Sequence, residues 1–338
     1  LLFPGKSQED TSGNDIIKKE IPNTQIIDSI NPFNWRSTAR KIAKKNPDLL
    51  ILRFWIPFFA PAFYKICRYV KKKTGAKVLF ICDNVIPHEH RPGDNFLIKL
   101  IFKAGDYFII HSKSVEEDLK KFVNGKPYKL TPHPIYNIFG EAAGKEESKR
   151  FLKKNFNIDV ENEKVILFFG YVRKYKGLNY LIEAMPDILK KIKVRLLIVG
   201  EFYEDESVTK DRIRDLKLEK NISVVSDYVP NEKVKYFFCA SDCVVLPYID
   251  ATQSGITQIA YYYDKPVIAT DVGGLSEVVL NNKTGFIIEP KNSKAIADSV
   301  VKFYEDDLEE KFSRNAGEEK KNYSWETFTD AIKNLVKH

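Results

Sequence analysis

The residues of this sequence best suited to chemistry form a basic loop within residues 165–184, VILFFGYVRKYKGLNYLIEA. The apolar run at its start predicts a buried strand that ends at Gly170, and a helical pattern begins after Gly177. Arg173 and Lys176 stand in the loop between them. Cationic side chains beside the free backbone amides of a helix start bind a doubly charged phosphate group. A solvated basic loop is the alternative, and the P-loop pattern is absent.

A second polar segment spans residues 247–277, PYIDATQSGITQIAYYYDKPVIATDVGGLSE. Near its start, Gln253, Ser254 and Gly255 would present backbone amides and a hydroxyl to phosphates. Three neighbours belong to the same candidate site: Asp250, Thr252 and Ile256. The alternative is a turn that caps a buried helix through Thr252 or Ser254.

A third segment, residues 81–94 (ICDNVIPHEHRPGD), crowds polar side chains into the loop after a predicted strand. They are Asp83, Asn84, His88, Glu89, His90 and Arg91. Loops at strand ends carry binding groups in α/β proteins. Asp83 either accepts a hydrogen bond from a ligand hydroxyl or caps the turn that follows, and a purely structural loop also stays open. Ligands at consecutive positions suit zinc poorly, so we predict no metal site.

Two other histidines and the last segment complete the candidates. His133, within residues 129–136 (KLTPHPIY), either lines a cleft or is a satisfied structural histidine. His111 is expected in the core. The final residues, 323–337, follow Ser324 with an apolar stripe at helical spacing and predict an amphipathic helix.

Strand and helix patterns alternate along the chain and position these loops. Strands are expected at 48–53, 77–82, 107–111, 165–170, 195–200, 222–226, 243–247, 266–270 and 285–288. Helical patterns fall between them, including 115–122, 146–156, 177–191 and 231–240. Alternation of this kind predicts doubly wound parallel α/β sheets. A polar stretch at 141–164 interrupts it, so we expect two such domains facing a cleft.

Length and composition limit the class of protein. The 338 residues are long enough for two domains, and 43% hydrophobic with 30% charged residues is typical of a folded chain. Four cysteines are too few for a disulfide framework, and Cys239 and Cys243 are expected as reduced core residues. A reducing cytoplasm fits this usage.

The net charge of +8 suits phosphate groups or an anionic membrane surface. No nucleic-acid-binding motif occurs, so nucleic acid is not expected as a partner. Residues 49–64 are apolar but interrupted by Arg53, Pro57 and Pro61, which predicts a buried strand and a helix rather than a membrane span. Aromatic residues at 54–59 beside Lys71, Lys72 and Lys73 suggest a peripheral membrane contact, at the inner membrane face.

The segments at 165–184 and 243–277, with Trp325 near the end, resemble the family 4 (group 1) retaining glycosyltransferases, which have the GT-B fold. The run KPVIATDVGGLSEVV is close to that family's KPVIATDVGGLPEVV. The Lys of the family's GRLxxxKG pattern falls on Lys176. Tyr171 stands at the Arg of that pattern, so we carry the role of this Arg to Arg173.

The resemblance implies transfer of a sugar from a nucleotide diphosphate-sugar to a hydroxyl of a glycan or lipid-linked acceptor, with retained configuration, no metal and no cofactor. The donor would be bound by Gly170, Tyr171, Gly200, Glu201, Tyr228, Val229, Asp250, Thr252, Gln253, Ser254, Gly255 and Ile256. Catalytic roles would fall to Arg173, Lys176, Asp83 and His88, and acceptor binding to Asn84, Glu89, Arg91 and His133.

The resemblance also implies a division into an acceptor-side domain (1–140), a donor-binding domain (141–322) and a helix that crosses back (323–338). Two departures stand out. Ala251 and Ile259 occupy the places of two family glutamates, and no strand, Gly-rich loop and helix precede residues 2–8 (LFPGKSQ). The first domain is therefore expected to be incomplete at its start. A non-catalytic nucleotide-sugar-binding protein or inactive fragment stays the alternative, and a dehydrogenase lacks its GxGxxG here.

Overall fold

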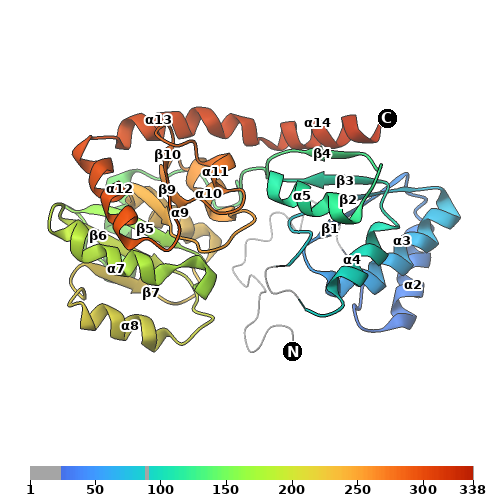
Figure 1. Ribbon diagram of the computed structural model, residues 1–338, viewed down its shortest axis with the longest axis horizontal. Helices are drawn as coiled ribbons and strands as arrows, with labels where there is room; N and C mark the ends of the chain where they lie inside the picture. The colour runs from blue at the N-terminus through green and yellow to red at the C-terminus, as the bar shows by residue number, and fades with distance from the viewer. Residues whose placement is uncertain (1–23, 88–90, 338) are drawn as a thin grey trace.

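The computed structural model describes residues 24–87 and 91–337, which form two parallel β-sheets lying side by side along the long axis of the molecule (Figure 1). The first sheet has the order β1-β2-β3-β4, with β1 Leu49–Phe54, β2 Lys77–Cys82, β3 Tyr107–Ile110 and β4 Tyr128–Leu130. The second has the order β10-β9-β8-β5-β6-β7, with β5 Lys164–Phe169, β6 Val194–Val199, β7 Ile222–Val225, β8 Cys243–Leu246, β9 Val267–Thr270 and β10 Gly285–Ile288.

Helices connect the strands in both halves. Around the first sheet they are α2 Pro32–Ala43, the 3₁₀ turn Pro57–Phe59, α3 Ala60–Thr74, α4 Asp94–Phe102 and α5 Lys113–Phe122. Around the second they are α6 Lys145–Phe156, the 3₁₀ turn Lys174–Lys176, α7 Leu178–Leu189, α8 Glu206–Asp215, α9 Asn231–Ala240, α10 Gly255–Tyr262, α11 Leu275–Val278, α12 Ser293–Glu305 and α13 Glu309–Glu319. The chain ends with the 3₁₀ turn Lys320–Tyr323 and α14 Trp325–Val336.

Both sheets are covered on two faces, which is why their central strands are continuous apolar runs. One face of the first sheet packs against α3, α4 and α5. On its other face, Phe328 of α14 contacts Leu79 and Ile109, so the last helix returns to the first half of the chain. In the second sheet, α6, α9 and α10 cover one face, and α7, α12 and Phe312 cover the other.

The strand predictions agree closely with the structure. All nine strands predicted with bounds occur, each within one residue at either end. One observed strand, β4, lies outside every predicted range, because it is short and its three residues are all exposed. For residues 49–64 the sequence predicts a buried strand followed by a helix. The strand, β1, lies at the edge of its sheet and leaves Ile51 51% exposed, so the prediction that it is buried is wrong.

The aromatic surface predicted at residues 54–59 does not form as such. Phe54 is buried, at 2% exposure, in the core beneath α3. Phe58 and Phe59 are half-buried and pack edge to face, with Phe59 stacked on Phe63. Trp55 is 39% exposed, so most of this aromatic area lies inside the first half of the chain because it serves the packing of α3.

The four cysteines are free and buried, which agrees with the core placement predicted for Cys239 and Cys243. Within the described ranges, each helix is too short or too polar to cross a membrane.

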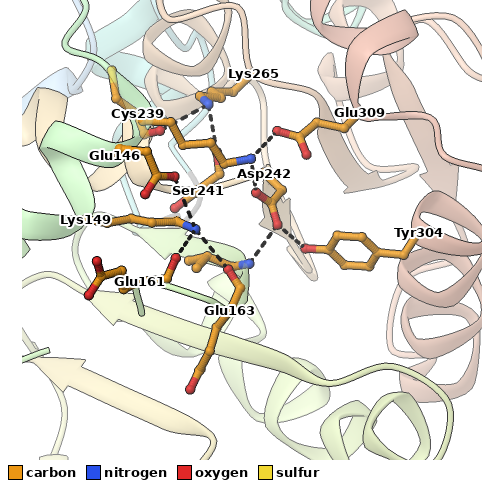
Figure 2. Close-up of polar contacts among 12 residues, drawn as sticks. Glu146, Lys149, Glu161, Glu163, Cys239, Ser241, Asp242, Lys265, Tyr304 and Glu309 are labelled. Carbon is orange, nitrogen blue, oxygen red and sulfur yellow. Dashed lines mark hydrogen bonds and ion pairs between the residues drawn. The ribbon is translucent and has the colours of Figure 1, made fainter. Parts of the chain in front are cut away.

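The amino edge of the second sheet is held by a buried polar cluster, which Figure 2 shows. Asp242, just before β8, is 2% exposed and its carboxylate accepts from the backbone N–H of Val165 at 2.7 Å and from the hydroxyl of Tyr304 at 2.8 Å. Lys145 of α6 lies 2.6 Å from the same carboxylate and 2.6 Å from Glu309. One buried acid therefore ties β5, α6, α12 and α13 together.

Candidate functional site

The carboxyl ends of the two sheets meet through direct contacts. After β8, the Thr252 hydroxyl donates a hydrogen bond to Asn84, which follows β2. The backbone N–H of Lys113, at the start of α5, donates to both carboxylate oxygens of Glu277, at 2.9 and 3.1 Å. In parallel α/β sheets, ligands bind at the carboxyl ends of the strands. The residues near these two contacts therefore form the candidate site.

A cavity of about 250 Å³ opens at the carboxyl ends of β5 and β6. It is lined by Phe139, Phe169, Gly170, Tyr171, Lys176, Gly200, Glu201, Tyr228, Val229, Asn231, Val234 and Ile256. Seven predicted donor-binding residues thus lie around one cavity together with Lys176. Sequence reasoning missed Phe139, Phe169, Asn231 and Val234. Phe169 and Asn231 adjoin predicted positions, but no local pattern marks Phe139, which comes from the segment between the sheets.

Two glycines let the strand ends approach one another at the wall of this cavity. Gly200 has a φ of +143°, and a Cβ there would lie 2.2 Å from the carbonyl oxygen of Gly170. Residues with a side chain rarely adopt this conformation, and the contact leaves no room for one. Backbone therefore lines the cavity at both strand ends.

Lys176 supplies the positive charge of the cavity. It ends the 3₁₀ turn Lys174–Lys176 and is 8% exposed, with its ammonium 3.0 Å from where a Cβ on Gly170 would stand. Burial lowers its pKa from the ordinary lysine value, and the nearby charge of Arg173 lowers it further. Its ammonium lies 5.4 Å from the centre of the Tyr248 ring, and among the described residues no carboxylate forms an ion pair with it. A buried ammonium of this kind favours an anion in the cavity.

Arg173 lies close to this site but lines a different cavity. Its guanidinium stacks 4.5 Å from the centre of the Tyr203 ring. With Lys174 and Glu204 it borders a neighbouring cavity of about 260 Å³ on the α7 side. The structure therefore brings Lys176, and not Arg173, to the cavity that the predicted donor residues share.

The loop at 250–256 contains the capping turn that the sequence left open. The Ser254 hydroxyl accepts from the backbone N–H of Ile256 at 3.3 Å and caps α10. Gly255 lies against Tyr136, because a Cβ there would be 3.1 Å from its ring. Asp250 is exposed and Gln253 is partly exposed. Ala251 and Ile259 are buried, so the side chains at the two family glutamate positions belong to the core.

On the side of the first sheet, Asp83 is held by an arginine that sequence reasoning missed. Arg53, at the end of β1, donates from Nε at 2.6 Å and from a terminal nitrogen at 3.1 Å to the two Asp83 carboxylate oxygens. This two-point pairing fixes the direction of the carboxylate. The local sequence gives no indication of this pairing, because the two residues are 30 positions apart.

Two histidines surround this ion pair. His111 is buried, its Nδ1 is 2.9 Å from the Thr131 carbonyl, and burial lowers its pKa to about 4. His133 lies 3.3 Å from both Arg53 and the Tyr136 hydroxyl, and burial lowers its pKa as well. Both rings are therefore neutral near pH 7. His133 lies beside the Arg53–Asp83 pair, and His111 is the core residue that the sequence predicts.

The remaining acceptor-side predictions are placed as follows. Asn84 bonds to Thr252 as described, so one predicted acceptor residue contacts one predicted donor residue. Arg91 is exposed, and its backbone N–H donates to Asp94 at 2.8 Å. His88 and Glu89 lie outside the described residues. Over the described ranges, no three His, Cys, Asp or Glu side chains gather as metal ligands would.

A family model described as glycosyl transferases group 1 matches residues 149–335, more than half of the chain. An uncharacterized glycosyltransferase of Methanocaldococcus jannaschii is 29% identical over 182 residues, which cover 52% of this chain and 45% of that protein. The N-acetyl-alpha-D-glucosaminyl L-malate synthase of Bacillus anthracis is 24% identical over 86% of this chain and 73% of its own length. The chain thus spans less than half of the first of these relatives.

Solved structures resemble the fold over most of its length. A glycosyltransferase from Rickettsia africae has a TM-score of 0.73 and 25% identity, covering 95% of this chain and 85% of that one. HepE of Anabaena, solved in complex with UDP, has a TM-score of 0.73 and 17% identity, covering 90% and 82%. The second likeness concerns the fold alone, and both agree with the two-domain arrangement of parallel sheets.

Proposed function

Because this chain belongs to the family of group 1 glycosyl transferases and has their GT-B fold, we propose that it transfers a sugar from a nucleotide diphosphate-sugar to an acceptor hydroxyl. The proposal includes retention of the anomeric configuration and independence of a metal ion. The observation that carries it is the buried ammonium of Lys176, which has no carboxylate partner among the described residues and lies in the cavity at the end of β5.

In this proposal the donor occupies that cavity. Gly200, Glu201, Tyr228 and Val229 would contact the base and ribose, since they line its wall beyond β6. The diphosphate would lie beside Lys176 and the amides near Ser254 and Gly255, with Gly170, Tyr171 and Ile256 around it. Asp250, Thr252 and Gln253, which lie in the loop at 250–256, would contact the sugar of the donor.

Negative charge develops on the diphosphate as the bond to the sugar breaks. Lys176 would stabilise that charge, with Arg173 as a second cation from the neighbouring wall. Because the ammonium is already desolvated, its attraction for the leaving group is stronger than in water. These cations would take the part that a divalent metal plays in other transferases.

On the acceptor side, the Asp83 carboxylate would accept a hydrogen bond from the acceptor hydroxyl, held in direction by Arg53. Asn84, Arg91 and His133 would bind the rest of the acceptor, a glycan or lipid-linked saccharide. His88 and Glu89 retain their proposed catalytic and acceptor-binding roles. The division at residues 140 and 322, the cytoplasmic location and the inner-membrane contact stay predictions.

The first experiment is a thermal-shift series with UDP-, GDP- and ADP-sugars in the presence of EDTA. UDP-sugars come first, because HepE was solved with UDP. One nucleotide should raise Tm selectively, and Lys176→Ala should abolish the shift while Lys191→Ala, at an exposed lysine of the same half, preserves it.

The same series tests the alternative, a non-catalytic binder, which the apolar Ala251 and Ile259 first suggested. Donor binding with neither hydrolysis nor transfer would favour it. An absence of any shift would overturn the donor site itself.

A further inference from the structure

Basic residues are distributed very unevenly between the two halves of this chain. Residues 1–140 hold 23 Lys and Arg against 13 Asp and Glu, and residues 141–338 hold 31 against 33. The excess is most concentrated in residues 29–82, where 12 basic residues accompany a single acid, Asp48. These residues form α2, β1, α3 and β2, so the positive charge gathers on one part of the fold.

Helices α2 and α3 display this charge on their exposed sides. They pack together through Trp35, Ala39, Ala62, Ile66 and Val70. The exposed cations are Arg36, Arg40, Lys41, Lys44 and Lys45 in and just after α2, with Lys65, Arg68, Lys72 and Lys73 on α3. Among the described residues, no Asp or Glu forms an ion pair with any of these nine side chains. We call these nine residues the α2–α3 basic surface.

The spacing of these cations makes them a continuous surface. Arg36, Arg40 and Lys44 recur every four residues, which places them along one stripe of α2. Lys65, Arg68 and Lys72 form a matching stripe on α3. Lys65 bridges the two helices, since its ammonium lies 5.2 Å from the centre of the Trp35 ring. Like charges repel one another when no anion is near, so this arrangement costs stability unless an anionic partner binds it.

Apolar side chains stand beside the cations at the start of α2. Phe33 is 88% exposed and Ile30 is 75% exposed, and Phe33 occupies the first turn of the helix. Figure 1 shows α2 at the end of the molecule far from the six-stranded sheet, so this edge is clear of the donor cavity. Cations bordering exposed aromatic and aliphatic side chains match the interface of a bilayer, where headgroups are charged and the adjacent layer is apolar.

We propose that the α2–α3 basic surface, with Phe33 and Ile30, binds an anionic lipid bilayer. This deepens the proposed function, on which it rests for its purpose, because a lipid-linked acceptor requires the enzyme at a membrane. The surface differs from the aromatic patch expected at residues 54–59, which is largely buried. Binding itself is independent of glycosyl transfer, so vesicle binding and donor binding are measured separately.

The experiment is co-sedimentation of the full chain with vesicles of phosphatidylcholine, with and without about one quarter phosphatidylglycerol. We expect binding only to the anionic vesicles. It should weaken strongly between about 0.1 M salt, where the Debye length is about 10 Å, and about 1 M, where it is about 3 Å. Equal binding to neutral vesicles would overturn the proposal.

The variant Arg36→Gln/Arg40→Gln/Lys44→Gln/Arg68→Gln removes four of the nine cations. It should weaken binding at least about 100-fold, because each basic side chain near an anionic surface contributes about fivefold. The matched control, Arg150→Gln/Lys154→Gln/Lys311→Gln/Arg314→Gln, removes four exposed charges from α6 and α13 and should bind nearly as well as the original chain. Equal losses in both variants would mean that net charge, and not this surface, attracts the vesicles, and would overturn the proposal.

Two further measurements separate lipid from other anions. Phe33→Ser should weaken vesicle binding at least about threefold without changing binding to a soluble polyanion, because only a bilayer offers an apolar layer. Binding to oligogalacturonate or RNA as tight as to the vesicles would assign the surface to a soluble polyanion and overturn the bilayer. Nucleotide-sugar thermal shifts of both quadruple variants should match the original chain, so a failure here leaves the donor site standing.

Discussion

The second sheet has lysines at both of its edges, and two of them, Lys145 and Lys176, differ in whether an acid pairs with them. At the amino edge, Lys145 pairs with Asp242 and Glu309, and the ammonium of Lys149 donates to two backbone carbonyls (Figure 2). At the carboxyl edge, Lys176 is as buried as Lys149, yet no acid pairs with it within the described part of the chain.

This difference separates charges that hold the fold from a charge available to a ligand. Burial opposes the charge of Lys145, but the carboxylates of Asp242 and Glu309 together outweigh it, and the pKa of Lys145 lies above its ordinary value. Burial is not compensated at Lys176, whose pKa is lowered. A buried charge without a partner destabilises a folded chain, so its presence at a cavity indicates a function.

Of the changes that test this comparison, removing Asp242 should have the largest effect on stability. We expect Asp242→Ala to lower the free energy of unfolding by about 3–5 kcal/mol, because it leaves the backbone N–H of Val165 and the charge of Lys145 without their buried partner. Urea unfolding measures this. The control is Asp211→Ala, at an exposed acid that pairs only within α8, and it should change stability by less than about 0.5 kcal/mol.

Lys176→Met should produce the opposite pattern. Transfer should fall about 100-fold or more, because a cation at the leaving group is lost, while the free energy of unfolding stays the same or rises. Initial rates and urea unfolding of the same preparation test both parts. A loss of stability like that of Asp242→Ala would mean that Lys176 is structural, and the contrast between the two edges would fail.

Tyr304→Phe tests the amino edge more gently. The variant removes only the Tyr304 hydroxyl and, with it, one hydrogen bond to the buried Asp242 carboxylate. We therefore expect the free energy of unfolding to fall by about 1.5–3 kcal/mol. Donor-induced thermal shifts should be unchanged. A weakened donor shift in this variant would show that the two edges are coupled through the sheet.

The smallest effect concerns pH. The difference in unfolding free energy between the original chain and Lys176→Met should depend on it. Between the lowered pKa of folded Lys176 and the ordinary lysine value of 10.5, the unfolded chain binds more protons at this site, so its contribution to stability rises with pH. The slope is at most about 1.4 kcal/mol per pH unit. Urea midpoints of both proteins across this window measure it, and a difference that falls with rising pH would contradict the assignment.

The sequence predicts the fold well because its signals are local. The apolar runs of β2 and β10 match the observed strands at both ends, and those of the other predicted strands match within one residue. The basic loop before α7 identifies Lys176, since a strand, a glycine and a helix start lie within 15 residues of one another. Local periodicity also predicts α14, whose apolar stripe is visible in its own sequence.

Pairings between distant segments were not predictable in this way. Arg53 and Asp83 are 30 positions apart, and Lys113 meets Glu277 across 164 positions. Tyr136 gives no signal that its ring lies against Gly255. Phe54 and Phe58 were expected in an exposed patch, because composition does not reveal which aromatic residues a neighbouring helix covers.

The strand and helix positions, the parallel α/β class and the chemistry of the basic loop were determined by the sequence itself, because each depends on residues that are neighbours along the chain. Only the tertiary structure decided that Lys176 is buried beside a cavity while Arg173 stacks on Tyr203. Both are cations in one loop, and the physical difference between them is desolvation. Desolvation depends on what packs around a side chain, and those neighbours come from distant parts of the fold.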